Sequence, residues 1–285
     1  MKASVHWPRI AIVGVGLIGG SVGLAALSRR LAGRVIGVGR SAGSLAEAKR
    51  AGAVTETTTD LAAAVAEADL VVVATGVAAI PAMLDAIDAA VRPGTLITDA
   101  GSTKQSIVAH WEKRRRSRRG RFVGGHPIAG SHRRGPAAAD ATLFAGRVTV
   151  VTPAKATPAA DVEDVGGFWA ALGSTVFVMP PRQHDQLLAA TSHAPHVIAA
   201  AIAAATPPEA RQFTAGGWRD TTRIAAGDPD LWADILLDNA PMVAKALSRI
   251  AAATEKMLSA LEKNDRKKLV SLLKAAKEDR DAVGS

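Results

Sequence analysis

Polar residues suited to catalysis gather in three parts of this sequence. Residues 99–105 read D-A-G-S-T-K-Q and residues 124–135 read G-G-H-P-I-A-G-S-H-R-R-G, each directly after a short apolar run. A third group, within residues 184–225, contains H-D, T-S-H-A-P-H and W-R-D-T-T-R-I-A. Imidazole titrates near neutral pH, so histidines in such segments can move protons during a reaction. These residues can act together only if the fold brings them to one place.

A glycine motif near the N-terminus predicts a dinucleotide site. The apolar residues 10–13 run directly into G-x-G-x-x-G at Gly14, Gly16 and Gly19, and a helical segment follows. Gly14 permits the tight turn, Gly16 lets the backbone approach a pyrophosphate, and Gly19 lets helix and strand pack closely. The pyrophosphate would lie on the amides of the helix N-terminus. A glycine-rich turn without a ligand is the alternative.

The end of the second predicted strand favours NADP over NAD. An NAD enzyme usually places Asp or Glu there to accept a hydrogen bond from the ribose 2′-hydroxyl. This chain has Gly39, Arg40 and Ser41 instead. A guanidinium and a hydroxyl suit a 2′-phosphate, although Arg40 as a solvated loop residue is the alternative.

Short β-branched runs alternate with helical segments up to about residue 178. This alternation predicts a parallel sheet covered on both faces, with a mixed far edge where less helix separates the strands. The predicted strands are 9–13, 34–38, 70–74, 95–98, 121–124, 147–151 and 175–178. The predicted crossover helices include 21–32, 44–51 and 80–91.

The character of the chain changes after Pro180-Pro181. From residue 182 onward helical patterns dominate, with amphipathic helices predicted at 245–261 and 265–277. The helix 197–205 is apolar nearly all round, so we expect it to be buried within its domain or between subunits. The predicted organisation is an α/β dinucleotide-binding domain, residues 1–178, followed by an all-α domain, residues 179–285.

Composition excludes several classes of protein. The chain has 285 residues, 48% of them hydrophobic, and a net charge of +9. It has no cysteine, which excludes disulfide scaffolds and thiolate chemistry. Seven of the positive charges fall within residues 113–121, so we expect a basic surface loop after a helix and consider contact with nucleic acid the weaker interpretation. No unbroken apolar run of about 18 residues occurs, so we expect a cytoplasmic protein without a membrane helix.

Six motifs occur in order between Gly14 and Trp232. They are G-x-G-L-I-G-G-S, D-x-G-S-x-K, G-G-H-P-x-A-G, H-D-x-x-x-A-x-x-S-H-x-P-H, R-D-T-T-R-I-A and D-P-x-L-W. In these motifs the sequence resembles the prephenate/arogenate (cyclohexadienyl) dehydrogenase family of tyrosine biosynthesis. The resemblance implies a Rossmann-type domain followed by an all-α dimerisation domain, a homodimer, and NADP or NAD as cofactor. The implied reaction is oxidative decarboxylation, in which a hydride leaves ring C4 and the ring carboxylate leaves as CO2.

The resemblance also implies roles for individual residues. His126 would polarise or deprotonate the 4-hydroxyl of the substrate, Ser102 would hydrogen-bond His126 and the nicotinamide amide, and Arg223 would bind a substrate carboxylate. The predicted substrate-binding residues are Ser131, Ser192, His196, Gly216, Asp220 and Arg223. The predicted cofactor-binding residues are Gly14, Gly16, Leu17, Ile18, Gly19, Gly39, Arg40, Ser41, Thr75 and Ser102.

Each of these roles has a purely structural alternative. His126 can be a satisfied turn histidine, and Ser102 opens an S-x-x-Q capping box with Gln105. Arg223 can form a surface ion pair with Asp220, which the family pattern instead suggests as its tether. A metal site built from histidines and the neighbouring acid is disfavoured because the ligand spacing is incomplete; its candidate ligands would be His184, Asp185, His193 and His196.

One position departs from the family pattern. Many members read G-T-E after H-P-x-A, whereas this chain has His132 in place of the acidic residue, followed by Arg133 and Arg134. Ion-pair gating with Arg223 is therefore in doubt, and a cationic entrance that attracts an anionic substrate is one interpretation. Two other functions stay open: a β-hydroxyacid or imine-type dehydrogenase, and a protein that binds NADP and a polyanion without turnover.

Overall fold

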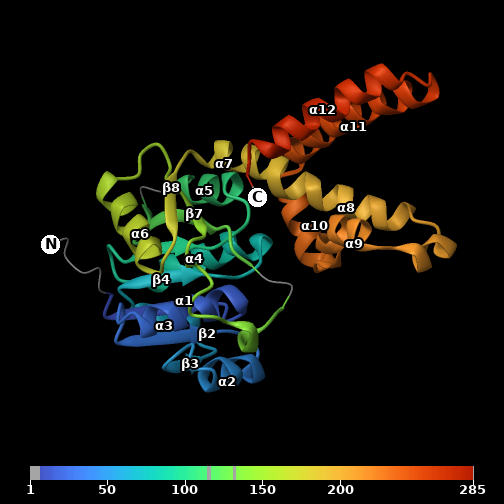
Figure 1. The fold of residues 1–285 in the computed structure, drawn as a ribbon. Coiled ribbons are helices and arrows are strands. Elements are labelled where there is room, and N and C mark those ends of the chain that lie inside the picture. Colours follow the sequence, from blue (N-terminus) through green and yellow to red (C-terminus); the bar gives the residue numbers. More distant parts are fainter. Residues whose placement is uncertain (1–6, 114–116, 131–132, 285) are drawn as a thin grey trace.

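The structure is a computed structural model that describes residues 7–113, 117–130 and 133–284 (Figure 1). Within these residues, eight strands form one sheet in the order β3-β2-β1-β4-β5-β6-β7-β8. The strands are β1 (Arg9–Val13), β2 (Arg34–Val38), β3 (Glu56–Thr58), β4 (Leu70–Val73), β5 (Leu96–Asp99), β6 (Arg121–Pro127), β7 (Val148–Thr152) and β8 (Thr175–Val178). The order of the first six is that of a dinucleotide-binding fold, with the reversal between β1 and β4.

The far edge of the sheet is mixed, as the alternation along the chain predicted. Neighbouring strands are parallel except β6 and β7, which pair antiparallel with His126 opposite Val150. The sequence did not predict β3. Its three residues, Glu56 to Thr58, are polar and only half-buried, so they carry no apolar signal.

Helices cover both faces of the sheet, and each face has its own hydrophobic core. Ile10 and Ile12 of β1 point to one face, and Ala11 and Val13 point to the other. The first face packs against α1 (Leu17–Ser28), α2 (Ala42–Arg50) and α6 (Ala159–Ala171). The second face packs against α3 (Leu61–Ala66), α4 (Ile80–Ala90) and α5 (Gln105–Glu112). Burial on both faces explains why these strands are apolar throughout.

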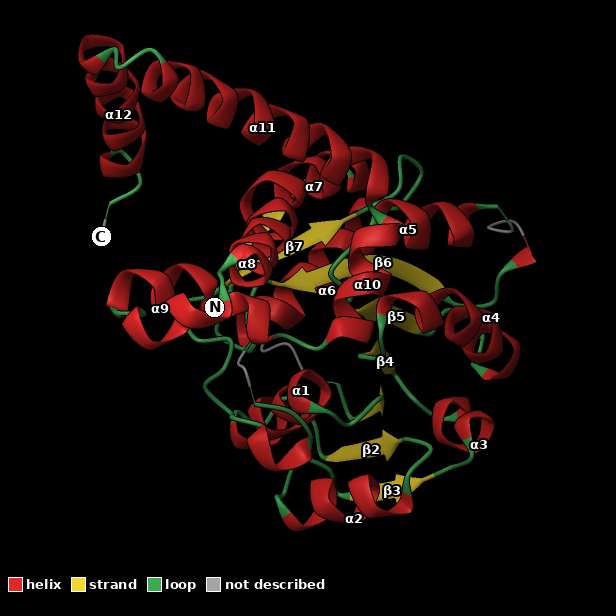
Figure 2. Cartoon of the chain, turned by 90° about the vertical axis from the view of Figure 1, so that its right-hand side faces the viewer, coloured by secondary structure: helices red, strands yellow, loops and turns green. Residues whose placement is uncertain are grey.

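The chain is helical beyond β8, with no strand in its described part. The helices are α7 (Pro181–Leu188), a π-helical turn (Ala189–His193), α8 (Ala194–Ala205), α9 (Gly216–Thr222), α10 (Pro229–Asp238), α11 (Ala240–Glu262) and α12 (Arg266–Asp281). Figures 1 and 2 show that α11 and α12 extend away from the sheet domain. Leu258, Leu261 and Leu273 on these two helices are exposed in the single chain. Much of α8 is also open to solvent, contrary to burial within its own domain.

One helical segment of the described chain is long and apolar enough to cross a membrane. It runs from Pro181 to Ala205 with a mean hydropathy of 1.4. The sequence did not predict this segment, because polar residues interrupt its apolar run. His184 and Asp185 lie on this segment and hydrogen-bond to the sheet domain. A helix surrounded by lipid has no such polar partners, so the contacts of His184 and Asp185 argue against a membrane span.

The basic run after α5 is partly built into the fold. Residues 114–116 lie outside the described part. The side chain of Arg118 is only 5% exposed, forms ion pairs with Asp85 and Asp88, and stacks over Trp111. The expectation of a solvated loop is therefore wrong for Arg118, because its charge is neutralised by α4.

Candidate active site

The turn between β1 and α1 has the shape that a pyrophosphate requires. Gly14 has a φ of +95°, and a Cβ there would lie 2.7 Å from the carbonyl oxygen of Ala74. A Cβ on Gly19 would lie 1.9 Å from the carbonyl oxygen of Gly14, so only glycine lets helix and strand approach this closely. A Cβ on Gly16 would meet no protein atom within 4 Å, which leaves its backbone open to a ligand. No side chain caps the N-terminus of α1.

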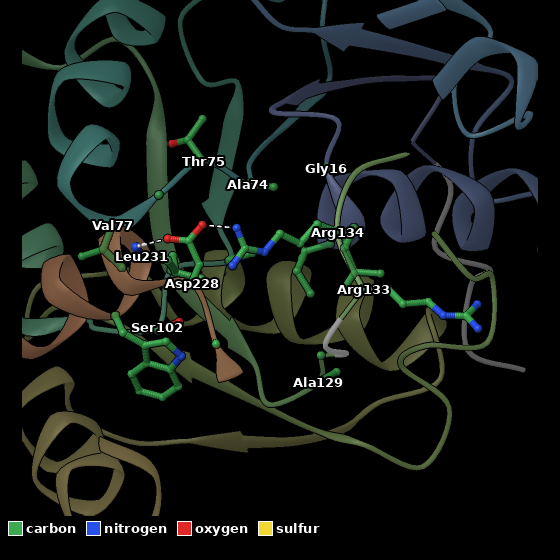
Figure 3. Close-up of a pocket in the computed structure, with 18 of the residues that line it drawn as sticks. Gly16, Ala74, Thr75, Val77, Ser102, Ala129, Arg133, Arg134, Asp228 and Leu231 are labelled. Atoms are coloured by element: carbon green, nitrogen blue, oxygen red, sulfur yellow. Dashed lines mark hydrogen bonds and ion pairs between the residues drawn. The ribbon is translucent and has the colours of Figure 1, made fainter. Parts of the chain in front are cut away.

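A cavity of about 500 Å³ opens in front of this turn (Figure 3). Leu17, Ile18 and Ser102 line it together with Thr75, whose hydroxyl is buried and has no hydrogen-bond partner among the described residues. An orphaned hydroxyl beside an open glycine turn fits a polar ligand such as a dinucleotide. Residues of the helical domain close the other side of the cavity, among them Asp228, Leu231 and Trp232.

The residues predicted to select NADP lie beyond this cavity, at the end of β2. Arg40 is exposed there, and a Cβ on Gly39 would contact only ordinary neighbours. The Ser41 hydroxyl accepts a hydrogen bond from the Ser44 amide and so caps α2. Arg40 is therefore free of the cavity wall and positioned at the strand end where an adenosine ribose binds in such folds.

An ion pair crosses the mouth of the same cavity. Arg134, in the loop after β6, pairs with Asp228, and Figure 3 shows the two side chains meeting. Asp228 also accepts a hydrogen bond from the Leu231 amide at 2.8 Å, which caps α10. This amide and the Arg134 guanidinium lower the pKa of Asp228. The pair joins the sheet domain to the helical domain beside the cofactor site.

A second cavity, of about 480 Å³, contains His126 and shares Ser102 and Trp232 with the first. His126 lies in β6, directly after Gly124 and Gly125. A Cβ on Gly124 would lie 2.5 Å from the Thr152 hydroxyl, and one on Gly125 would lie 2.8 Å from the Asp99 carbonyl oxygen. The two glycines let β6 pack between its neighbours and bring the imidazole to the wall of the second cavity.

The His126 imidazole is 8% exposed and hydrogen-bonded to a second imidazole. Its Nδ1 atom lies 2.8 Å from Nε2 of His184, and Nδ1 of His184 lies 2.8 Å from Oδ1 of Asp185. Burial lowers the pKa of His126 well below 6.5, and the nearby His184 and Lys104 lower it further. His126 is therefore a neutral imidazole at physiological pH, able to accept a proton.

A buried lysine lies behind this histidine pair. Lys104 is fully buried; its ammonium group pairs with Asp99 and donates to the Gly125 carbonyl oxygen at 2.9 Å. Burial lowers the pKa of Lys104, and the Asp99 carboxylate acts in the opposite direction. The ammonium group thus fixes the backbone immediately before His126.

Ser102 does not cap α5, contrary to the capping-box alternative. The helix begins at Gln105 with Lys104 as its N-cap residue, and the Lys104 side chain does not cap it. Instead, the carboxylate of Asp185 accepts hydrogen bonds from the Lys104 and Gln105 amides, both at 2.8 Å. An acid from α7 therefore takes this role, and Ser102 lines both cavities. It forms no hydrogen bond with His126 in the described structure.

The helical domain contributes an aromatic wall. His196 stacks on Trp232 with ring centroids 3.6 Å apart and an interplanar angle of 12°. Ser192 and His193 lie on the π-helical turn, beside the His126 cavity. Asn239 donates to Nδ1 of His193 at 3.1 Å, and burial lowers the pKa of His193 from 6.5 to about 4. These groups are neutral at physiological pH.

Comparison with known proteins places the chain in a family. A family model described as "Prephenate dehydrogenase, nucleotide-binding domain" matches residues 23–178. A second, described as "Prephenate dehydrogenase, dimerization domain", matches residues 180–275. This chain belongs to the prephenate dehydrogenase family.

Individual relatives agree over nearly the whole chain. The Bacillus subtilis prephenate dehydrogenase is 34% identical over 96% of this chain and 76% of its own length. The Zymomonas mobilis cyclohexadienyl dehydrogenase is 32% identical over 96% of this chain and 95% of its own length. The crystal structure of A. aeolicus prephenate dehydrogenase with hydroxyphenyl propionate and NAD+ has a TM-score of 0.90 at 28% identity, covering 99% of this chain and 100% of that one.

The structure does not bring every residue implied by the family resemblance to the cavities. Gly216, Asp220 and Arg223 are exposed on α9 and the turn after it, and they line neither cavity. No ion pair joins Asp220 and Arg223 in the described structure, although they are three residues apart. Ser131, like His132, lies outside the described residues.

Several residues that the sequence reasoning did not single out contribute to the site. Arg147 precedes β7 and lines the His126 cavity, where it is the one permanently charged side chain among the described lining residues. Trp232 was present only as the last letter of D-P-x-L-W. His184 and Asp185 were weighed only as metal ligands, yet no group of three or more candidate ligands occurs among the described residues. Their spacing to His126, 58 residues away for His184, carries no sequence signal.

Proposed function

We propose that this member of the prephenate dehydrogenase family oxidatively decarboxylates prephenate or arogenate, with NADP+ as the preferred hydride acceptor. One observation carries the proposal. A buried, neutral imidazole, His126, lines a cavity with an aromatic wall, and this cavity shares Ser102 and Trp232 with the cavity in front of the dinucleotide turn. Such a base beside a cofactor site suits the removal of a proton from a hydroxyl as a hydride leaves the same carbon.

His126 acts as the proton acceptor for the 4-hydroxyl of the substrate. As the proton moves to the imidazole, electrons from the oxygen form the carbonyl at C4 and the hydride can depart. Loss of the ring carboxylate as CO2 then gives the aromatic phenol. When bound, NAD(P)+ supplies the nicotinamide ring that takes up the hydride.

Ser102 lies between the two cavities, and we assign it to orienting the cofactor against the substrate. Ser102 is within the lining of both spaces. Ser192 and Trp232 bound the space for the ring, and His196, which lines neither cavity, stacks on Trp232.

The substrate carries two carboxylates, and we propose Arg147 as a group that binds one of them. Arg147 lines the cavity that contains His126, whereas Arg223 is exposed outside it. A guanidinium can pair with both oxygens of a carboxylate. Arg223, the residue implied by the family resemblance, would reach a substrate only if a second subunit or a domain movement brought it to a cavity.

The preference for NADP+ rests on Arg40 and on the absence of an acidic side chain directly after β2. Arg40 is exposed at this strand end and has no acidic neighbour in Gly39 or Ser41. A guanidinium attracts a 2′-phosphate, whereas an acid would repel it. The amide end of α2, capped by Ser41, adds partial positive charge nearby.

We further propose a homodimer formed through the helical domain and a cytoplasmic location. Exposed leucines on α10, α11 and α12 support the dimer, because a soluble monomer rarely leaves such side chains uncovered together. They are Leu237, Leu258, Leu261 and Leu273. The family model that matches residues 180–275 is described as a dimerization domain.

The test is an assay of nicotinamide reduction that crosses prephenate and arogenate with NAD+ and NADP+. We expect turnover with at least one substrate and a higher kcat/KM with NADP+. No turnover in any of the four combinations would refute the enzymatic assignment. Cofactor binding accompanied by polyanion binding would then favour the non-catalytic alternative.

A paired substitution tests the carboxylate site. Arg147→Gln should raise the KM for the substrate by about tenfold or more, because a charged hydrogen bond contributes about 1.5–3 kcal/mol. Arg223→Gln serves as the matched variant and should leave KM near its wild-type value. The opposite result, with Arg223→Gln alone raising KM, would assign the carboxylate to the helical domain.

A further inference from the structure

Two hydrogen bonds link an acid of the helical domain to the proposed catalytic base. Asp185 Oδ1 lies 2.8 Å from Nδ1 of His184, and Nε2 of His184 lies 2.8 Å from Nδ1 of His126. His184 is fully buried, and Asp185 is 2% exposed. The two rings meet edge to face with centroids 5.0 Å apart. In a buried chain of hydrogen bonds each donor needs an acceptor, and this requirement determines which nitrogen carries each proton.

The acid at the end of the chain is held in its acceptor state. Both of its oxygens accept backbone hydrogen bonds, Oδ1 from the Lys104 amide and Oδ2 from the Gln105 amide, each at 2.8 Å. These amides form the N-terminus of α5, where partial positive charge favours a carboxylate. An ionised carboxylate only accepts, so Nδ1 of His184 must donate to it.

The donor role of His184 determines the next hydrogen bond. Burial lowers the pKa of His184 and outweighs the hydrogen bond to Asp185, which acts in the opposite direction, while the Lys104 ammonium group adds to the lowering. A neutral imidazole carries one proton, and Nδ1 holds it, so Nε2 of His184 is an acceptor. Nδ1 of His126 must then be the donor, which leaves the lone pair of His126 on Nε2.

We propose that His184 and Asp185 are positioning residues that hold His126 in the tautomer protonated on Nδ1, so that Nε2 is the atom that accepts the substrate proton. The proposal rests on the assigned role of His126 as proton acceptor. In the other tautomer Nε2 would carry a proton and could not accept one. An acid that orients a catalytic imidazole through its second nitrogen is an established device in hydrolases.

The arrangement also makes catalysis depend on contact between the domains. His126 belongs to β6, whereas His184 and Asp185 belong to α7. The charged groups around the pair are Lys104 and Asp99 from the sheet domain, and the neutral His193 faces it from the π-helical turn. The helical domain therefore supplies one wall of the cavity and also the residues that orient the His126 imidazole.

The direct test is the tautomer of His126 in the full-length protein with bound NADP+. Long-range ¹H–¹⁵N correlation spectra of protein with ¹⁵N-labelled histidine distinguish a protonated ring nitrogen from an unprotonated one. The His126 signals are assigned by their loss in His126→Asn. At pH 7 we expect the proton on Nδ1. A wild-type spectrum with the proton on Nε2 would overturn the proposal without any variant.

Two substitutions at His184 separate positioning from simple packing. His184→Gln places an amide oxygen near the lost Nε2 atom and should keep the His126 proton on Nδ1 and most of kcat. His184→Leu offers no acceptor, so His126 should shift toward the tautomer protonated on Nε2, with kcat lower by about 10²-fold and KM nearly unchanged. If His184→Leu keeps both the tautomer and kcat, the positioning role is refuted.

The two readouts also separate this proposal from the proposed function. The tautomer is measured without turnover, so it can be confirmed even if neither cyclohexadienyl substrate reacts. Conversely, a working dehydrogenase whose His126 carries its proton on Nε2 would retain the proposed function and lose the positioning role.

Discussion

The cofactor cleft and the histidine cluster are built in opposite ways. The cleft centres on the backbone of one continuous stretch, the turn between β1 and α1, and the demands of that turn are steric. The cluster is made of buried side chains from β6, from the N-terminus of α5 and from α7. Its demands are electrostatic, because each buried polar atom needs a partner.

This difference sets how each region responds to change. A local turn tolerates change wherever space is open and fails where a Cβ would strike backbone. A buried polar network fails when one member loses its partner, because the group left behind keeps its desolvation cost. Substitutions in the cleft should therefore change affinity or stability, and those in the cluster should change kcat.

The largest expected effect is in the cluster. His126→Asn should lower kcat by about 10²–10⁴-fold, since the proton acceptor is lost. The Kd of NADP+, measured by tryptophan fluorescence, should change little. His110→Asn is the matched control, because His110 pairs with Asp85 on the far side of α5. Near-normal turnover of His126→Asn would show that another group accepts the proton.

Within the cleft, two glycines should respond differently. Gly19→Ala should lower the free energy of unfolding by about 1–3 kcal/mol, because its Cβ would overlap the Gly14 carbonyl oxygen. Gly16→Ala meets no protein atom, so it should leave the melting temperature nearly unchanged and weaken NADP+ binding. Equal melting temperatures for both variants would contradict the steric distinction.

Arg40 tests the outer end of the cleft. Arg40→Gln should weaken NADP+ binding by about tenfold or more and leave NAD+ binding unchanged, since a charged hydrogen bond contributes about 1.5–3 kcal/mol. Arg50→Gln removes an equal charge from the end of α2 and is the matched control. A similar loss with both cofactors would mean that Arg40 does not read the 2′-phosphate.

The smallest expected effect is the pH dependence of stability. Burial lowers the pKa of His193 from 6.5 to about 4, so between these values the unfolded chain binds more protons than the folded one. Stability should therefore be complete above pH 6.5 and fall as the pH drops toward 4. His193→Asn, which keeps an acceptor for Asn239, should flatten this slope in denaturant titrations. An unchanged slope would exclude His193 as a source.

Local patterns in the sequence predicted the cleft well. G-x-G-x-x-G after an apolar strand predicts the backbone shape seen at Gly14 and Gly19. The close contacts that require glycine there involve atoms only a few residues away or on the neighbouring strand. The alternation of strands and helices predicted the layered sheet for the same reason. The sequence did not predict the polar strand β3, because half-buried edge residues carry no apolar pattern.

The sequence determined which chemistry is possible, and the tertiary structure decided which residue performs each role. The types and order of the residues around the glycine turn, Ser102 and His126 identified the chain as similar to one family of dehydrogenases. That Asp185 caps α5 in place of Ser102, and that His184 contacts His126, follows only from packing α7 against the sheet domain. Such contacts depend on burial and proton location across distant segments, and no local spacing encodes them.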